Sequence, residues 1–430
     1  MNVLMLGWEF PPLFSGGLGV ATYGLVKALR ASTSITLIVP RSDPSGTLGE
    51  VQVIGVSNAL KEELNREGKQ HNLAALAREV EQIPLSISPY GFLNQILEAE
   101  ETSRLLEDYT SDEPLYLKLS KYFEGSEAYG SDIHRKVHLF SHLADHLSRR
   151  HDFSVIHAHD WVTYPAGMRI QQRTGKPLVL HVHALETDRA GHEVRNAIFD
   201  LEKNALKAAD AIIAVSQYTK EQLRRYYDIA PNRITVVHNG VDTEAVRRQP
   251  HRLRDKLVVF LGRITRQKGP EFLLETADKL VRVYPRVKFV VAGTGDEFAH
   301  LLESTAYRKL GRKFIFTGFL EKQKVNDLLS MTDVYFMPSV SEPFGLTALE
   351  AALHGVPGVI SRQSGALEVL PALSADFWDT DKYANYIYAL LTYPTLHREL
   401  AARANARAKD LTWDSAAAKI SRIYYNLTAA

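Results

Sequence analysis

Short runs of apolar and β-branched residues alternate with helix-like segments along most of this 430-residue chain. This alternation predicts an α/β fold with parallel sheets whose faces are covered by helices. Helices are expected, for example, over residues 21–31, 271–284 and 347–353, where apolar residues recur three and four positions apart. The expected strands are 3–6, 35–39, 155–157, 178–182, 211–215, 235–237, 257–261, 288–292, 314–317, 334–337 and 359–361.

The pattern starts again after a polar stretch at residues 243–256, which contains one proline. Two doubly wound, Rossmann-like domains joined by a linker explain this restart, with a ligand cleft between them. Residues 41–135 do not follow the alternation. They contain helical pieces at 62–67 and 73–80 and one or two expected strands, and we interpret them as an insertion in the first domain.

Composition excludes several classes of protein. Lysine and arginine together number 51 against 50 aspartates and glutamates, so the overall charge does not favour nucleic acid or an anionic membrane as a partner. Cysteine is absent, which excludes disulfides, thiolate zinc sites and a cysteine nucleophile. The N-terminus lacks the basic region of a signal peptide and no run is long enough for a transmembrane segment, so we expect a cytoplasmic protein.

A glycine-rich segment that contains Gly16, Gly17 and Gly19 follows the first expected strand. Glycines allow a ligand to approach the backbone, and the start of the next helix offers unpaired N–H groups and a positive dipole end. The segment therefore fits a phosphate, although a tight strand–helix turn would use the same residues. It is not a dinucleotide fingerprint, because Thr22 stands where the last glycine is needed, and no Walker A motif occurs.

Two cations follow the first strand of the second half. Arg263 is expected at the carboxyl end of that strand, where doubly wound folds bind ligands, and Lys268 comes shortly after it. A guanidinium can bind two phosphate oxygens at once, and a lysine adds a movable point charge. Together they could neutralise a diphosphate; the alternative is a solvated basic turn.

Two glutamates mark a later loop and its helix. Glu342 is expected in the loop, Glu350 in the helix, and Phe344 and Gly345 between them. Amide groups at such a junction face a bound anion, and a carboxylate on the helix can accept hydrogen bonds from ribose hydroxyls. The spacing of the two glutamates carries no specificity by itself, and an exposed carboxylate on the helix surface is the alternative.

Four histidines cluster in the first half, at His157, His159, His181 and His183. At strand spacing the first two share one face, as do the last two. The pattern could supply half of a metal site, but only aspartates are available as further ligands and no H-E-x-x-H helix is present. Histidines at strand ends that face a polar cleft are the preferred interpretation, and we expect no metal.

In this order, the motifs resemble those of retaining glycosyltransferases of the two-domain GT-B architecture, in glycosyltransferase family 4. The N-terminal Gly-Trp-Glu-Phe-Pro-Pro, the glycine-rich segment and the His-Asp-Trp at 159–161 are most similar to glycogen and starch synthases and their close relatives. The resemblance covers nearly the whole chain except residues 41–135. It implies an acceptor-side domain over 1–245, a nucleotide-sugar-binding domain over 246–410 and a C-terminal helix over 411–430 that packs back on the first domain.

The resemblance also implies how the donor would be held. Gly16 and Gly17 would offer backbone N–H groups to the donor diphosphate. Arg263 and Lys268 would hold that diphosphate and stabilise the leaving nucleotide, so that the partner of Lys268 would be the ligand rather than the protein core. Glu350 would bind the donor ribose.

A second group of residues is implied to contact the transferred sugar. Glu342 would bind its hydroxyls, and backbone amides at Phe344 and Gly345 would contact the sugar or phosphate. His183 resembles the histidine that lies against the sugar near the anomeric carbon. The residues implied to line the same cleft are His159 and Asp160.

The expected reaction is transfer of glucose from ADP-glucose or UDP-glucose to a glucan or another hydroxyl acceptor, with no cofactor. Fixed cations and helix-end amides suit a leaving diphosphate, whereas no pair of carboxylates is placed for glycosidase chemistry. The resemblance implies that the departing phosphate takes the acceptor proton, which retains the configuration. Relatives usually have a paired-glycine loop where this chain has Ala366 after Gly365, so the identity of the sugar is less constrained than the reaction class.

Three alternatives remain open from the sequence. A nucleotide-dependent oxidoreductase would use the doubly wound fold and the segment 17–19, and a metal-dependent hydrolase would use the four histidines. A glycan-binding scaffold without activity is the third, but it has no chemical need to keep both cations and both glutamates.

Overall fold

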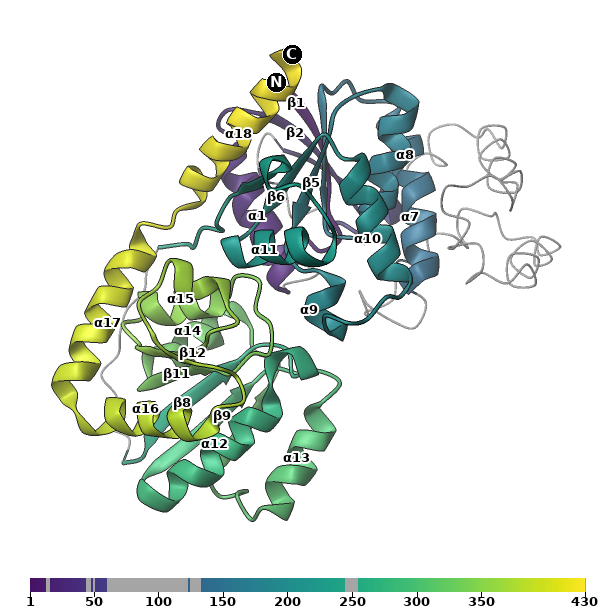
Figure 1. Ribbon diagram of the computed structural model, residues 1–430. Helices are drawn as coiled ribbons and strands as arrows, with labels where there is room; N and C mark the ends of the chain where they lie inside the picture. The colour runs from purple at the N-terminus through teal and green to yellow at the C-terminus, as the bar shows by residue number, and fades with distance from the viewer. Residues whose placement is uncertain are drawn as a thin grey trace, which may run out of the picture.

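The computed structural model describes residues 1–12, 16–43, 48, 51–59, 123, 133–243 and 254–429. Its strands form two parallel sheets, a seven-stranded one in the order β3-β2-β1-β4-β5-β6-β7 and a six-stranded one in the order β10-β9-β8-β11-β12-β13 (Figure 1). The strands of the first sheet are β1 (Asn2–Leu6), β2 (Ser34–Val39), β3 (Gln52–Gly55), β4 (Val155–His159), β5 (Leu178–Val182), β6 (Ala211–Ala214) and β7 (Ile234–Val236). Those of the second are β8 (Lys256–Leu261), β9 (Val287–Ala292), β10 (Phe314–Gly318), β11 (Val334–Met337), β12 (Gly358–Ser361) and β13 (Leu373–Ala375).

Helices connect the strands and cover both faces of each sheet (Figure 1). The first sheet carries α1 (Gly17–Leu29), α7 (Ile133–Ser148), α8 (Tyr164–Thr174), α9 (Glu186–Ala190), α10 (Ala197–Ala208) and α11 (Gln217–Tyr226). The second carries the short η3 (Arg266–Lys268), α12 (Pro270–Val283), α13 (Phe298–Tyr307), α14 (Lys322–Ser330), α15 (Leu346–Leu353), α16 (Thr380–Thr392) and α17 (Pro394–Lys409), and α18 (Trp413–Ala429) follows them in the chain. The predicted α/β class with two doubly wound sheets is therefore confirmed.

Among the described residues, all the strands whose bounds the sequence predicts are present, β3 falls where a strand was expected without bounds, and β13 was not predicted. β3 lies within residues 41–135 and pairs in parallel with β2, so Gln52–Gly55 belongs to the first sheet. β13 is an edge strand of only three residues, Leu373–Ala375, which is too short for a periodic signal. The helical pieces expected at 62–67 and 73–80 lie outside the described residues.

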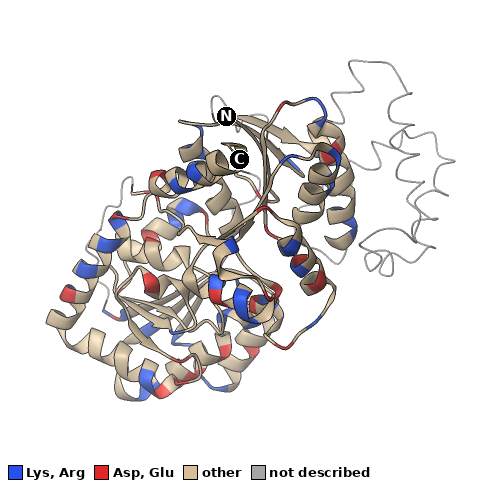
Figure 2. Ribbon diagram, turned by 45° about the horizontal axis from the view of Figure 1, so that its top comes forward, with Lys and Arg blue, Asp and Glu red and all other residues tan. Residues whose placement is uncertain are grey.

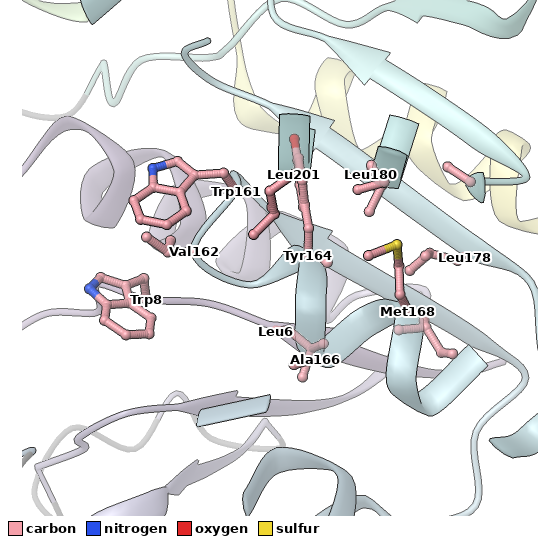
Figure 3. Packing of buried hydrophobic residues seen from close by; sticks show 14 of the residues in the cluster. Leu6, Trp8, Trp161, Val162, Tyr164, Ala166, Met168, Leu178, Leu180 and Leu201 are labelled. Atoms are coloured by element: carbon pink, nitrogen blue, oxygen red, sulfur yellow. The ribbon is translucent and has the colours of Figure 1, made fainter. Parts of the chain in front are cut away.

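The period-two alternation of β1 divides the core of the first sheet between its two faces. Leu4 and Leu6 join the cluster under α7, α8 and α10, where Trp8, Tyr164 and Met168 also pack (Figure 3). The alternate residues of β1 point to the opposite face, which α1 and α18 cover. Because β1 is buried on both faces, its sequence is a continuous apolar run rather than an alternation of apolar and polar residues.

The last helix, α18, packs on the first sheet although it follows the second in the chain. It lies beside α1, and Gly24 of α1 makes this close approach possible, because a Cβ there would lie 2.2 Å from Cε2 of Trp413 (Figure 1). Tyr424 of the same helix is fully buried against the first sheet. The chain thus crosses twice between the two sheets.

Charged residues of both signs are interspersed along the helices that cover the two sheets, as Figure 2 shows. Among the described residues, no helix combines the length and the apolar character needed to cross a membrane. Any anion site therefore depends on a few positioned cations rather than on a broad basic surface.

Candidate functional site

The residues predicted from the sequence lie at the carboxyl ends of the central strands of both sheets. In each sheet the strand order reverses beside the first strand, between β1 and β4 and between β8 and β11, which is where doubly wound folds bind ligands. Gly16 and Gly17 follow β1, His159 and Asp160 end β4, His183 follows β5, Arg263 and Lys268 follow β8, and Glu342, Phe344, Gly345 and Glu350 follow β11.

Lys268 and Glu342 form an ion pair at the ends of β8 and β11. The Lys268 ammonium donates to Glu342 Oε2, and the two side chains are 24% and 8% exposed. Ser339 Oγ donates to the same carboxylate oxygen at 3.4 Å. Lys268 therefore has a partner within the protein, which was not predicted, and its cation offsets the cost of burying the Glu342 carboxylate.

Glu350 lies in the first turns of α15 and pairs with Lys322, the first residue of α14. Its side chain is only 14% exposed, so it is not the exposed surface carboxylate that was the alternative. Lys322 is 59% exposed and can move away from the pair. Its partnership with Glu350 was not predicted, since a lysine at the start of a helix carries no distinguishing signal.

Gly16 and Gly17 sit at the start of α1, next to a carboxylate from the preceding loop. Glu9 is 6% exposed, and its Oε2 accepts the backbone N–H of Gly19 at 3.2 Å. A Cβ at Gly16 would lie 2.3 Å from the same oxygen, whereas one at Gly17 would meet no atom within 4 Å. Glu9 thus accepts one of the backbone N–H groups at the start of α1. The space beside this turn is open at Gly17.

The turn before α15 requires a glycine. Gly345 caps the helix with a φ of 91°, in the left-handed region that favours glycine. The Phe344 ring is buried at 3% exposure and stacks on His238, so its backbone rather than its ring is available to a ligand. Ala366 is fully buried beside this turn. A Cβ added at Gly345 would lie only 3.3 Å from the Ala366 methyl carbon, so this methyl group reduces the space next to Gly345.

The four histidines of β4 and β5 form one stacked column. His159 pairs in register with His181, and the ring centroids of His181 and His183 are 4.3 Å apart. At one end His157 Nδ1 lies 2.5 Å from the Tyr424 hydroxyl of α18, and at the other His159 Nδ1 lies 2.9 Å from His183 Nε2. The column therefore runs from the covered face of the sheet to its carboxyl edge.

The rings of the histidine column lie at small angles to one another. One ring nitrogen each from His157, His159 and His181 lies within 4.8 Å of the others. Their rings, however, make angles of only 8°, 25° and 30° with one another, so the in-plane lone pairs run side by side instead of converging as a tetrahedral centre requires. Burial lowers the pKa of His157 and of His183 to about 3, which keeps both rings uncharged at neutral pH.

Asp160 holds the loop that carries His183. It has a φ of 58°, and its Oδ1 accepts the backbone N–H groups of His183 at 2.7 Å and of Ala184 at 3.2 Å. Burial raises the pKa of Asp160 to about 7, against the opposing effects of Arg189 and of these two hydrogen bonds. This aspartate fixes the position of His183 through the backbone.

The two sheets meet beside Glu342 through residues that the sequence did not single out for this purpose. Asp188 of α9 accepts a hydrogen bond from Ser341 Oγ at 2.5 Å, and Ser216 Oγ donates to the Pro343 carbonyl at 2.6 Å. Glu368 accepts the N–H groups at the start of α11 and contacts His238. No local pattern could have revealed them, because each partner lies more than a hundred positions away in the chain.

Two family models match the chain. The model described as Glycosyltransferase Family 4 matches residues 124–245, and the model described as Glycosyl transferases group 1 matches residues 241–410.

Three curated relatives match this chain over different shares of its length. The α-maltose-1-phosphate synthase of Mycolicibacterium smegmatis is 30% identical over 64% of this chain and 80% of its own length. The glycogen synthase of Mycobacterium tuberculosis is 26% identical over 99% of this chain and 94% of its own length. An uncharacterized glycosyltransferase of Methanocaldococcus jannaschii is 30% identical over 51% of this chain, and the match spans 60% of that relative.

Solved structures share the fold over the whole chain. Sucrose-phosphate synthase from Thermosynechococcus elongatus matches with a TM-score of 0.73 at 18% identity, covering 100% of this chain and 99% of that chain. The catalytic domain of starch synthase IV from Arabidopsis thaliana, bound to ADP and acarbose, matches with a TM-score of 0.70 at 15% identity and covers 100% of both chains. The chain therefore belongs to glycosyltransferase family 4, has the GT-B architecture and is a glycosyltransferase.

Proposed function

We propose that this glycosyltransferase moves glucose from ADP-glucose or UDP-glucose to a hydroxyl acceptor with retention of configuration. The observation that carries the proposal is the ion pair of Lys268 and Glu342 at the carboxyl ends of β8 and β11. A diphosphate that enters there offers Lys268 a doubly charged partner and leaves the Glu342 carboxylate free for the hydroxyls of the sugar. Arg263, which is exposed after β8, supplies the second cation.

The remaining donor contacts follow from the same arrangement. Glu350, at 14% exposure, accepts hydrogen bonds from the ribose once Lys322 moves aside. The amides at the start of α15 face the phosphate or sugar, because Gly345 opens that helix. Gly17, on the open side of the α1 terminus, offers its amide from the opposite sheet.

In the proposed reaction the bond between the anomeric carbon and the donor phosphate breaks, and a bond from the acceptor oxygen to that carbon forms. The acceptor proton passes to the departing phosphate on the same face, so no protein nucleophile is needed. Lys268 and Arg263 stabilise the charge that develops on the nucleotide. His183, held by Asp160 and His159, presents a neutral ring to the sugar.

Several features support a glucan or sugar-phosphate acceptor. The relatives named above include a glycogen synthase and an α-maltose-1-phosphate synthase, and a structural neighbour was solved with ADP and acarbose. For the compartment we propose the cytoplasm, which the cysteine-free sequence favours. We expect neither a cofactor nor a metal to be required.

Nucleotide release tests the proposal. The protein is incubated with ADP-glucose or UDP-glucose, each with an α-glucan, with glucose 1-phosphate or with no acceptor. We expect acceptor-dependent release of one nucleotide and a product that an α-glucosidase cleaves, since retention preserves the α-linkage. The Lys268→Ala variant serves as the control for contaminating activity. If neither nucleotide sugar is turned over or bound in calorimetry, the proposal is wrong.

A further inference from the structure

A buried hydroxyl group, that of Ser341, is among the links that join the two sheets beside the candidate site. Ser341 precedes Glu342 in the loop after β11 and is 2% exposed. Its Oγ lies 2.5 Å from Asp188 Oδ1 and 2.8 Å from the Tyr218 hydroxyl, and both partners belong to helices of the first sheet. The carboxylate can only accept and Ser341 has a single proton, so Ser341 donates to Asp188 and Tyr218 donates to Ser341.

The same serine is tied to the segment that carries Lys268. Gln267, the residue before Lys268, donates through Nε2 to the Ser341 carbonyl at 3.0 Å, and its own carbonyl accepts the Val340 N–H at 2.9 Å. Helix α9 in turn packs against η3, which contains Lys268. Ser341 is therefore one residue from Glu342 and one hydrogen bond from the neighbour of Lys268.

Asp188 is placed to fix this junction. It is 4% exposed, and its second oxygen, Oδ2, accepts the Leu185 N–H at 2.8 Å at the start of α9. Burial raises the pKa of Asp188, the hydrogen bond from Ser341 lowers it, and the charge of Glu342 raises it again. The carboxylates of Asp188 and Glu342 thus interact electrostatically across the boundary between the two sheets.

We propose that Asp188 is a positioning residue, which sets through Ser341 where Glu342 and Lys268 lie relative to His183. The inference rests on the proposed function, since it takes Glu342 and Lys268 to contact the donor. Asp188 follows His183 by five positions, so α9 connects the histidine edge of one sheet to the charged edge of the other. A misplacement of reacting groups by about 1 Å can cost on the order of 10²-fold in rate.

Steady-state kinetics of Asp188→Asn, Ser341→Ala and the double variant test the proposal. We expect kcat for donor turnover to fall by about 10- to 100-fold in each single variant. KM for the nucleotide sugar should change by less than about threefold, because the phosphate-binding cations remain. The double variant should be no slower than the slower single variant, since both remove the same tie. Ser341→Thr, which keeps the hydroxyl, should recover most of the rate.

Asp333→Asn is the matched control. Asp333 is 8% exposed and its Oδ2 accepts the Leu257 N–H at 2.9 Å, so it is a buried carboxylate with a backbone partner like Asp188. It precedes β11, at the amino end of the sheet and away from the candidate site. Both aspartate variants should lower the denaturant midpoint, but only Asp188→Asn should lower kcat. If Asp188→Asn fails to fold, Ser341→Ala and Tyr218→Phe carry the same test.

Three results would overturn the positioning role: wild-type kcat in Ser341→Ala, additive losses in the double variant, or an equal loss of kcat in Asp333→Asn. The double-mutant cycle of Asp188→Asn and Ser341→Ala is also measured with the denaturant midpoint as its readout. This readout does not depend on enzymatic activity. If the wild type releases no nucleotide, the proposed function fails, but non-additive midpoints still support the tie. Additive midpoints overturn it in either case.

Discussion

The two sheets present their functional groups at equivalent places by opposite means. At the carboxyl ends of β4 and β5 the first sheet places a column of four stacked histidines, all partly or fully buried and with lowered pKa values. At the corresponding ends of β8 and β11 the second sheet places charges, which are paired with one another. The histidine side suits an uncharged sugar, and the charged side suits a nucleotide diphosphate.

The two sheets differ in how they offset the cost of burying polar side chains. Neutral imidazoles can stack in a buried column, because an uncharged ring has a much smaller desolvation cost than an ion. A buried carboxylate is costly without a cation, and Glu342 and Glu350 are accordingly paired with Lys268 and Lys322. A donor that binds as proposed would displace the internal ion pairs of the charged side.

The largest expected effect is a loss of folding stability at low pH, which arises from the four histidines of the first sheet. Burial lowers the pKa of His157 and His183 to about 3 and holds the pKa of His159 and His181 well below 6.5. The unfolded chain takes up these protons near pH 6.5 and the folded chain does not, so stability falls as the pH drops below 6.5. Each histidine removes on the order of 1 kcal/mol per pH unit from the free energy of unfolding. Urea unfolding between about pH 7.5 and about pH 4.5 measures this slope.

His181→Phe sharpens this test, because phenylalanine keeps an aromatic ring in the column without a titratable group. The slope of stability against pH should then decrease by the share of one histidine, on the order of 1 kcal/mol per pH unit. His192 is exposed and stacks on Tyr226, so His192→Phe is the matched control and should keep the wild-type slope. Equal slopes in the wild type and in His181→Phe would contradict the explanation.

The next effect concerns the charged side. Lys268→Ala should lower donor turnover by about 10²–10³-fold, because a cation that stabilises the leaving nucleotide is lost. It should also destabilise the fold by roughly 1–3 kcal/mol, since Glu342 stays buried without its partner. The double variant Lys268→Ala/Glu342→Gln should regain stability but not turnover. Kinetics like those of the wild type in Lys268→Ala would remove Lys268 from the site.

The smallest expected effect concerns the ion pair of Lys322 and Glu350, whose two members should differ in their contribution to nucleotide affinity. Glu350→Gln should weaken nucleotide binding by about 1–3 kcal/mol, because a charged acceptor of ribose hydrogen bonds is lost. Lys322→Ala is the control: it frees the carboxylate and should leave the affinity for ADP or UDP unchanged or tighter. Calorimetry measures both. An equal loss of affinity in the two variants would assign the effect to the pair itself rather than to Glu350.

Much of this molecule could be predicted from local patterns. Strands buried on both faces give continuous apolar runs, so β5 and β11 were predicted with their observed ends, Leu178–Val182 and Val334–Met337. The motifs were recognisable because each occupies one loop between a strand and a helix, as Gly345 does before α15. The assignments of individual residues to donor and sugar stay predictions, and so do the domain boundaries.

What the sequence by itself determined was the class of fold, the family and the loops that carry the chemistry, since these depend on residues close together in the chain. Only the tertiary structure decided the partners: Glu9 beside Gly16, the stacked histidines of β4 and β5, and Asp188 bound to Ser341. Asp188 and Ser341 are 153 positions apart, and a contact at that separation imposes no period or spacing on either segment. Such pairs follow from how the two sheets pack together, which no single stretch of the chain encodes.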